Sequence, residues 1–331
     1  MPHHALPLFA LVSMLVLVAC SGPSNSATGS SPTEETLWAE ETGNSLLVHV
    51  GDELFTEFLY GHDPRPILFP LLSPSGVPVT RSYPMREVPE EAPDHPHHRS
   101  LWFAHGDVNG VDFWHEGAER PGRIVDNGWR ENVVVRDDTL RIGFGFDWND
   151  PQGNTLLTEQ RRMLFGATED ERWIDFEIAL TASDEDVTFG DTKEGTFAMR
   201  MHPELRLVGD VAKGSAVNST GVTGKDVWGK RAAWVHYQGS VSGKPVGVAM
   251  FEHPSNFRHP TWWHAREYGL VAANPFGVHD FERKPAGTGD HVLAASETLT
   301  LRYRVWIHAG TRTPQEVAEA FTLYRAQTSD L

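Results

Sequence analysis

The chain has 331 residues, with 45 acidic and 28 basic side chains, a formal net charge of −17 at pH 7, and one cysteine, Cys20. The negative charge repels polyanions, so nucleic acid is not expected as a partner. A single cysteine excludes an internal disulfide, a zinc site built from several thiolates and an iron–sulfur cluster.

The N-terminus has the features of an export signal. Its apolar run, Leu6–Ala19, is too short to cross a bilayer permanently but suits the core of a signal peptide. Leu17-Val18-Ala19-Cys20 resembles a lipobox, which predicts cleavage before Cys20 and lipidation of its thiol. Because no Lys or Arg precedes the apolar run, an ordinary secretory signal cleaved elsewhere is the alternative.

The predicted lipoprotein has three parts. Residues 1–20 form the signal peptide, and residues 21–36, rich in Ser, Pro, Gly and Thr, form a flexible tether. Residues 37–331 are expected to form a single domain that touches the membrane only through the lipid on Cys20. Ser21 is not the acidic residue that favours retention in the inner membrane, so we expect an outer-membrane lipoprotein facing the periplasm.

The expected domain shows mainly the two-residue hydrophobic alternation of half-buried strands. Strands are predicted at Val133–Val135, Leu140–Trp148, Leu156–Phe165, Ile174–Thr181, Phe197–Met201, Ala232–Tyr237, Val246–Phe251, Tyr268–Ala272 and Leu299–Ile307. One helix is strongly indicated, because Thr313, Pro314 and Glu316 provide an N-cap, a first-turn proline and a capping-box carboxylate. It is expected to run to about Arg325. The sequence therefore predicts an all-β antiparallel sandwich with one C-terminal helix, and no nucleotide-binding motif.

Polar residues of chemical interest gather in three segments. The first is Asp94–Glu116, the second is Glu252–Tyr268 with the later Asn274–Gly277, and the third is Lys193–Pro203. In the third segment, Arg200 and His202 are expected on one face of a strand and apolar side chains on the other, which indicates a wet concave surface.

Three interpretations of these segments compete. In sugar chemistry, the rings of Trp102, Trp114, Trp262 and Trp263 stack on the sugar while histidines and carboxylates transfer protons. In a metal site, His95, His97 and His202 are the ligands. In the third interpretation, these side chains only make the long loops rigid.

The segment from Asp94 to Arg99, the run from Trp102 to Gly110, and the motifs His259–His264 and Asn274–Gly277 together resemble a bacterial family labelled "PmoA family" or "methane oxygenase PmoA". The resemblance covers nearly all of the chain after the tether. Methane oxidation does not fit, because the mature sequence lacks a transmembrane segment. The resemblance instead implies a supersandwich similar to galactose-mutarotase-like folds, in which carbohydrate lies across a concave sheet. It also implies a histidine acid, either His98 or His202, and Glu194 as the base.

The leading hypothesis is an exported carbohydrate-active hydrolase, lyase or epimerase that needs no cofactor. The alternatives are an enzyme that depends on a divalent metal and a glycan-binding lipoprotein without activity. The predicted catalytic residues are His98, Glu194, His202 and His264. The predicted carbohydrate-binding residues are Arg99, Trp102, His105, Asp107, Trp114, Arg200, His259, Trp262, Trp263 and Asn274.

Overall fold

The computed structural model describes residues 36–89, 91–136 and 138–327. The predicted signal peptide, Cys20 and all of the predicted tether except Thr36 lie outside these residues. No helix among the described residues has both the length and the apolar character needed to cross a membrane.

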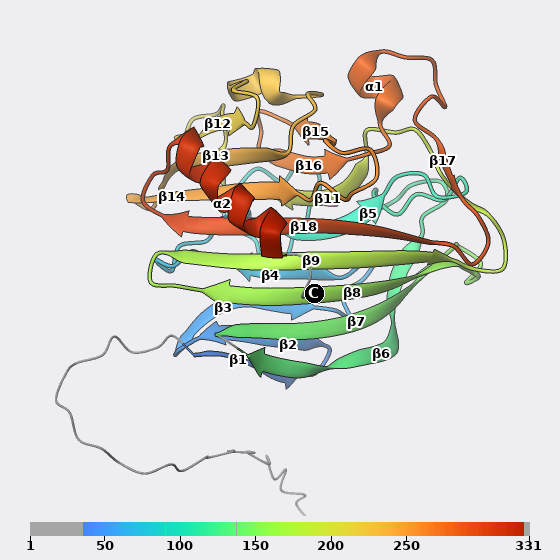
Figure 1. Ribbon diagram of the computed structural model, residues 1–331, viewed down its shortest axis with the longest axis horizontal. Coiled ribbons are helices and arrows are strands. Elements are labelled where there is room, and N and C mark those ends of the chain that lie inside the picture. The colour runs from blue at the N-terminus through green and yellow to red at the C-terminus, as the bar shows by residue number, and fades with distance from the viewer. Residues whose placement is uncertain (1–35, 90, 137, 328–331) are drawn as a thin grey trace, which may run out of the picture. The chain divides into compact units, whose positions relative to one another are not determined.

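Two large antiparallel sheets build the described domain (Figure 1). The first sheet has eight strands in the order β1-β2-β3-β4-β5-β11-β16-β15. These strands are β1 (Leu37–Thr42), β2 (Ser45–Val50), β3 (Glu53–Leu59), β4 (Ile67–Leu71), β5 (Leu101–His105), β11 (Gly195–Arg200), β16 (Leu270–Asn274) and β15 (Trp262–Ala265).

The second sheet also has eight strands, in the order β12-β13-β14-β18-β9-β8-β7-β6. These are β12 (Ser215–Asn218), β13 (Trp234–Val241), β14 (Lys244–Glu252), β18 (Thr298–Ala309), β9 (Glu171–Ala182), β8 (Thr155–Ala167), β7 (Thr139–Asn149) and β6 (Arg123–Arg136). A separate two-stranded sheet pairs β10 (Val187–Phe189) with β17 (His291–Leu293). The predicted all-β antiparallel sandwich is therefore confirmed.

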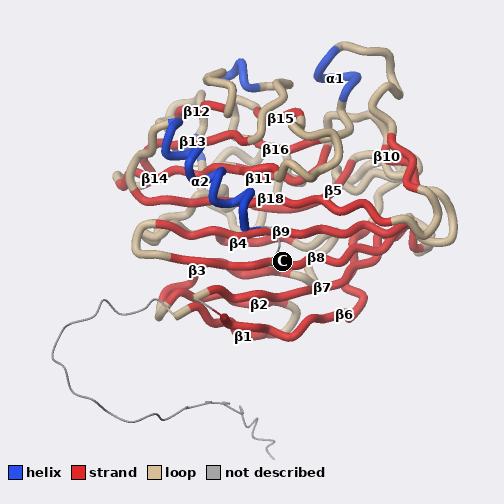
Figure 2. Tube along the Cα trace, in the orientation of Figure 1, coloured by secondary structure: helices blue, strands red, loops and turns tan. Residues whose placement is uncertain are grey.

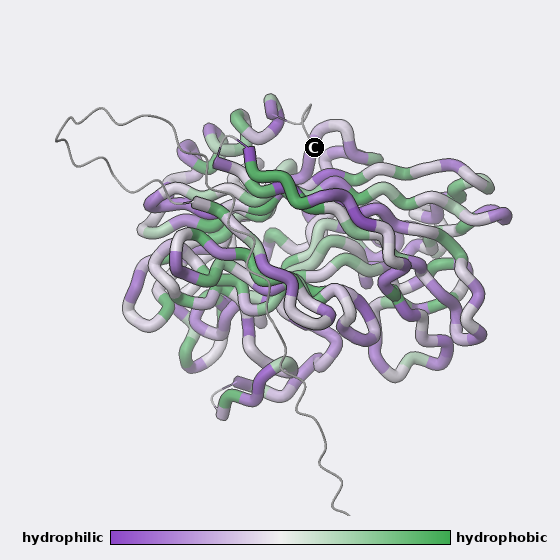
Figure 3. The backbone as a smooth tube through the Cα atoms, turned by 90° about the horizontal axis from the view of Figure 1, so that it is seen from below, coloured by the Kyte–Doolittle hydropathy of each residue, from purple (hydrophilic) through white to green (hydrophobic). Residues whose placement is uncertain are grey.

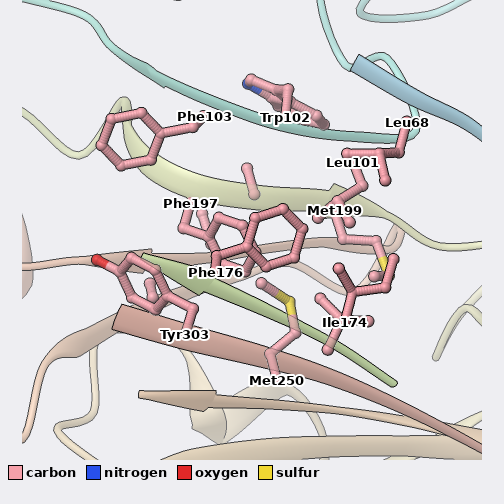
Figure 4. Packing of buried hydrophobic residues seen from close by; sticks show 14 of the residues in the cluster. Leu68, Leu101, Trp102, Phe103, Ile174, Phe176, Phe197, Met199, Met250 and Tyr303 are labelled. Atoms are coloured by element: carbon pink, nitrogen blue, oxygen red, sulfur yellow. The ribbon is translucent and has the colours of Figure 1, made fainter. Parts of the chain in front are cut away.

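The main core lies between the two large sheets. Phe176 of β9 and Tyr303 of β18 pack against Phe197 of β11, with ring centroids 4.9 and 4.5 Å from that ring (Figure 4). Hydrophobic stretches are frequent in the middle of the molecule, and hydrophilic ones are frequent at its periphery (Figure 3). Burial of these apolar faces is what holds the two sheets together.

Short helices complete the fold (Figure 2). They are η1 (Pro203–Leu205), η2 (Gly224–Val227), α1 (Val278–Glu282) and the longer α2 (Pro314–Gln327). Helix α2 packs on the outer face of the second sheet, where Val317 and Tyr324 meet Phe251 and Trp306 in a second small core. Its predicted capping box is confirmed, since the Thr313 backbone N–H donates to Glu316 at 2.7 Å and the Glu316 N–H donates to the Thr313 hydroxyl at 3.3 Å.

Strand β6 forms one edge of the second sheet, and its pairing with β7 is irregular. From Asp126 to Arg130 it advances four residues while β7 advances two, from Phe146 to Phe144. From Glu131 to Val134 it advances three residues against two of β7. Extra residues of this kind are β-bulges, which bend a strand and raise its twist.

Candidate functional site

A polar pocket of about 220 Å³ brings together residues from all three predicted segments. Its lining consists of five histidines and four other polar or aromatic side chains. These are His95, His97, His98, His115 and His264, with Lys193, Glu194, Arg266 and Tyr268. No aliphatic residue belongs to this lining, so the pocket presents mainly hydrogen-bonding groups.

The register of the first sheet explains how distant segments meet. Trp102 of β5 pairs with Ala198 of β11, Ala198 with Ala272 of β16, and Ala272 with His264 of β15. Because paired residues share a face, all four side chains project from the same side of the sheet. Phe103 and Phe197 alternate with this row and enter the core, so the row lies on the outer face of the sandwich. The loop carrying His95, His97 and His98 leads into β5 and packs on this row.

Arg200 and Asp94 fix the state of His98. One Arg200 nitrogen lies 3.0 Å from His98 Nδ1, and another donates to Asp94 Oδ1 at 2.9 Å. Because a guanidinium has only donors, His98 Nδ1 accepts and its Nε2 carries the hydrogen. Burial, then the charges of His97 and Arg200, hold the pKa of His98 far below its ordinary value. His98 is therefore a neutral hydrogen-bond donor at neutral pH, and its predicted role as an imidazolium acid is not supported.

His115, unlike His98, pairs with a carboxylate rather than with a cation. Its Nδ1 lies 2.9 Å from Oδ2 of Asp112, and the other oxygen of that carboxylate accepts from the backbone N–H groups of Trp114 and His115. The hydrogen bond to Asp112 raises the pKa of His115, and Glu194 raises it further through its charge. His115 thus favours the imidazolium form, with Nδ1–H held by Asp112 and Nε2 left for another partner.

Glu194 and His264 provide the bases of the pocket. Burial alone would raise the pKa of Glu194, but the charges of His264, Lys193 and His115 and a hydrogen bond from Lys193 lower it. His264 Nδ1 lies 2.9 Å from the Lys193 carbonyl and must donate to it, so Nε2 carries a lone pair. Burial lowers the pKa of His264 to about 4, and its Nε2 has no hydrogen-bond partner within the described residues.

The stacked rings of His95, His98 and Tyr268 form another wall of the pocket. The His95 ring lies 4.8 Å from the His98 ring and 4.9 Å from the Tyr268 ring, nearly parallel to both. Its Nδ1 lies 2.9 Å from Oδ2 of Asp94. Arg200 lies over Tyr268, with its guanidinium carbon 4.5 Å from the ring centroid. These contacts restrict the rotation of the pocket side chains before any ligand arrives.

The predicted metal ligands are not assembled. His202 does not line the pocket, and its Nδ1 instead accepts from the Glu204 backbone N–H at 3.2 Å at the start of η1. Across the described residues, no group of three or more His, Cys, Asp or Glu side chains is arranged to hold a metal ion. The structure therefore removes His202 both from the proposed ligand set and from the predicted catalytic residues.

The predicted stacking tryptophans are buried. Trp102, Trp114, Trp262 and Trp263 are each at most 4 % exposed. Trp102 and Trp114 lie beneath His98, with ring centroids 5.6 and 6.0 Å from it, and Trp263 donates to the Ala232 carbonyl. None of the four therefore presents an open ring face to a sugar, and the prediction is wrong for that reason.

Most of the other predicted binding residues act within the fold. Arg99 forms two hydrogen bonds to the carboxylate of Glu116, and His259 pairs with the buried Glu252. Asn274 donates to the Thr192 carbonyl and accepts from the backbone N–H groups of Phe276 and Gly277. His105 is fully buried against the Gly190 carbonyl, and Asp107 accepts from the Gly110 N–H in a turn. None of these five predicted residues lines the pocket.

The predicted site residues His95, His97, His98, Glu194 and His264 do line the pocket, and Arg200 supports it from behind. His115, Lys193, Arg266 and Tyr268 line it as well but were not among the predicted site residues. A sequence signal existed for His115, because it follows Asp112 by three residues in a loop that already contained several histidines.

Solved structures with some likeness to this chain include two galactose mutarotase-like proteins. The one from Clostridium acetobutylicum is 9% identical, covers 83% of this chain and 99% of its own, and has a TM-score of 0.39. The one from Lactobacillus casei is 10% identical, covers 82% and 100%, and has a TM-score of 0.36. No curated protein matches the sequence.

A family model matches residues 45–322, which is most of the chain and includes every residue of the pocket. Its description does not carry the PmoA name that the sequence motifs suggested, so that resemblance stays a prediction. The chain belongs to the family of unknown function DUF6807.

Proposed function

We propose that the pocket binds a carbohydrate and performs proton transfer on it, with His115 as the acid and Glu194 as the base. The observation that carries the proposal is that His115 and Glu194 line the same pocket and have pKa values shifted in opposite directions. The pKa of His115 is raised by its hydrogen bond to Asp112, while neighbouring charges lower that of Glu194 despite its burial. Each group also stabilises the charged form of the other.

Such a pair fits general acid–base chemistry. A protonated imidazole donates to an oxygen of the ligand, while an ionised carboxylate accepts a proton from carbon, from a hydroxyl or from water. Glycosidic cleavage, elimination and epimerisation all need one donor and one acceptor of this kind. His264 is a second acceptor, because its Nε2 lone pair is unpartnered within the described residues.

The lining of the pocket supports a polyhydroxylated ligand. All nine lining residues have a polar group, and the neutral His98 has a donor at Nε2. Lys193 pairs with Glu194 at 2.5 Å, which leaves Arg266 as a further cationic donor in the lining. The volume of about 220 Å³ lies below the range of roughly 300–1,000 Å³ for drug-sized ligands, which suits one sugar ring at a time.

The experiment uses deuterium from the solvent to identify which proton is transferred. The purified full chain, prepared without a His-tag, is incubated in D2O with free aldoses, their β-1,4-linked disaccharides and 4-nitrophenyl glycosides, and the products are followed by NMR. Epimerisation through carbon places deuterium on that carbon, elimination gives an unsaturated sugar, and hydrolysis gives a new reducing end.

The variants His115→Gln and Glu194→Gln should each lower the rate by at least about 100-fold, the usual contribution of one general acid or base. His279→Gln is the matched control, because His279 is exposed and outside the pocket. Full activity in either pocket variant would contradict the assigned roles. A sugar that binds without any product would favour glycan binding alone, and stoichiometric metal in the purified chain would replace the proposal with metal-dependent chemistry.

A further inference from the structure

A second hollow adjoins the pocket. It measures about 400 Å³, and Arg266 and Tyr268 line both the pocket and this hollow. A third hollow of about 570 Å³ continues from the second, with Val208, Lys225 and Glu267 common to the two. The shared residues place the three hollows next to one another, with the second between the pocket and the third.

Trp228 gives the second hollow its aromatic surface. It follows η2 directly, is partly buried and lines this hollow. It packs edge-on against Phe281, with ring centroids 5.7 Å apart, which holds the indole in place. Unlike the four predicted tryptophans, Trp228 keeps part of its surface accessible beside a pocket of polar groups.

Arg266 stands between the pocket and Trp228. Its guanidinium carbon lies 5.9 Å from the Trp228 ring centroid. No carboxylate forms an ion pair with Arg266 in the described part of the chain. Its remaining donors are therefore available to a ligand that passes from one hollow to the next.

We infer that the second hollow is a binding subsite for the next sugar unit, so that the substrate is an oligosaccharide or another glycoside rather than a free monosaccharide. The reacting ring occupies the pocket, Arg266 donates to oxygens near the linkage, and the apolar face of the second ring packs on Trp228. This inference rests on the proposed function, because it takes the reacting unit in the pocket to be a sugar.

The test compares sugars of increasing length. Isothermal titration calorimetry with the full chain measures the Kd for glucose, mannose and xylose and for the β-1,4-linked di- and trisaccharides of each. In the series that binds, the disaccharide should bind at least about tenfold more tightly than the monosaccharide, a difference well above the error of the method. Trp228→Leu should remove this gain and leave monosaccharide affinity unchanged, and Trp228→Phe should keep most of it.

Trp129→Leu is the matched control. Trp129 is a partly buried tryptophan with an arginine, Arg162, over its ring at 5.6 Å, but it lies on β6 and lines none of the three hollows. Thermal unfolding of each variant shows whether it is folded. If Trp228→Leu does not fold, Arg266→Met tests the subsite instead and should lower disaccharide affinity more than monosaccharide affinity.

The outcomes separate this inference from the proposed function. A monosaccharide that binds as tightly as its disaccharide, or a disaccharide gain that survives Trp228→Leu, would overturn the second subsite but leave the pocket assignment intact. If none of the sugars binds, both the subsite and the proposed function fail.

Discussion

Two histidines from one loop region show how strongly a hydrogen-bond partner decides the chemistry of a residue. His98 faces the cation Arg200 through Nδ1, which keeps its ring neutral. His115 faces the carboxylate of Asp112 through Nδ1, which favours its protonated form. The two rings begin with the same ordinary pKa of about 6.5, so their environment accounts for the difference.

The pH dependence of activity should therefore have two limbs. Glu194 must be ionised, so activity should rise as the pH increases through its pKa, which lies below the ordinary value. His115 must be protonated, so activity should fall as the pH increases through its pKa, which lies above the ordinary value. Each limb should change kcat/KM by about tenfold per pH unit.

Asp112→Asn provides a second readout of the same assignment. Loss of the carboxylate should lower the pKa of His115 and move the alkaline limb toward lower pH, by about one unit or more. A pH-rate profile of the variant beside the parent chain measures this shift. An alkaline limb that stays in place would show that another group, not His115, is the acid.

The candidate site could be predicted only in part from the sequence. The density of histidines points to a loop that lines the pocket, and the predicted residues Glu194 and His264 line it as well. The positions of Trp102 and Trp263 could not be predicted, because an aromatic ring beside a ligand and one beneath a layer of loops have the same local sequence. His202 was assigned to the site because alternation was extended past the end of β11, where the chain enters η1 instead.

At the scale of single elements, β8 contains an ion pair inside the sandwich. Glu159 and Arg161 are at most 1 % exposed, lie 2.6 Å apart, and share the inward face of β8 with Leu157 and Met163. Trp148 of β7 donates to the same carboxylate at 2.8 Å. The strand therefore keeps its hydrophobic alternation except at two positions, where a charge replaces an apolar side chain.

Replacement of either Glu159 or Arg161 alone should lower the free energy of unfolding more than replacement of both. Glu159→Leu should lower the free energy of unfolding by about 3–5 kcal/mol, because it leaves the buried Arg161 charge uncompensated. The double variant Glu159→Leu/Arg161→Met should recover most of this loss. Urea unfolding measures the coupling between the two positions in the parent chain, Glu159→Leu, Arg161→Met and the double variant. Losses that simply add in the double variant would contradict this prediction.

The elements of the second sheet were easier to predict than those of the first. Strand β8 alternates between buried and less buried residues along most of its length, as a sheet with one covered face requires, and β7 and β9 do so toward their ends. In β5, β11 and β16 every residue is buried. Loops cover the outer face of these strands, so their sequences lose the two-residue period from which strands are predicted.

At the scale of the whole molecule, neutral histidines in the interior and in the pocket link stability to pH. The pKa is lowered, chiefly by burial, in His97, His98, His105, His236, His264 and His308. His236 and His308 form a hydrogen-bonded pair, with 3.0 Å between their Nε2 atoms, and their pKa values are lowered to about 3 and about 4. Because His308 Nδ1 faces the Ala309 carbonyl at 3.2 Å, His236 is the donor within the pair.

The free energy of unfolding should therefore fall steeply on acidification. The unfolded chain binds protons at these histidines as the pH drops below about 6.5, whereas the folded chain does not until the pH is much lower. Each such histidine should contribute up to about 1.4 kcal/mol per pH unit between about pH 6 and 4. Urea unfolding at pH 7.5, 6 and 5 measures the slope.

His308→Gln should reduce this slope by about one proton, or about 1.4 kcal/mol per pH unit, whatever it does to stability at pH 7.5. His279→Gln, which changes an exposed histidine, should leave the slope unchanged. An unaltered slope in His308→Gln would mean that the His236–His308 pair takes up protons in the folded state.

The irregular pairing of β6 with β7 has a consequence for encounters between separate copies of the chain. Among the described strands none pairs with the outer edge of β6, where three successive valines, Val133, Val134 and Val135, are about half exposed. A straight strand with such an edge would be a template for another chain. The extra residues of β6 break the even spacing of its outward N–H and C=O groups, so a second copy cannot extend the sheet in register along its length. The same bulges that bend this strand thus oppose aggregation at its exposed edge.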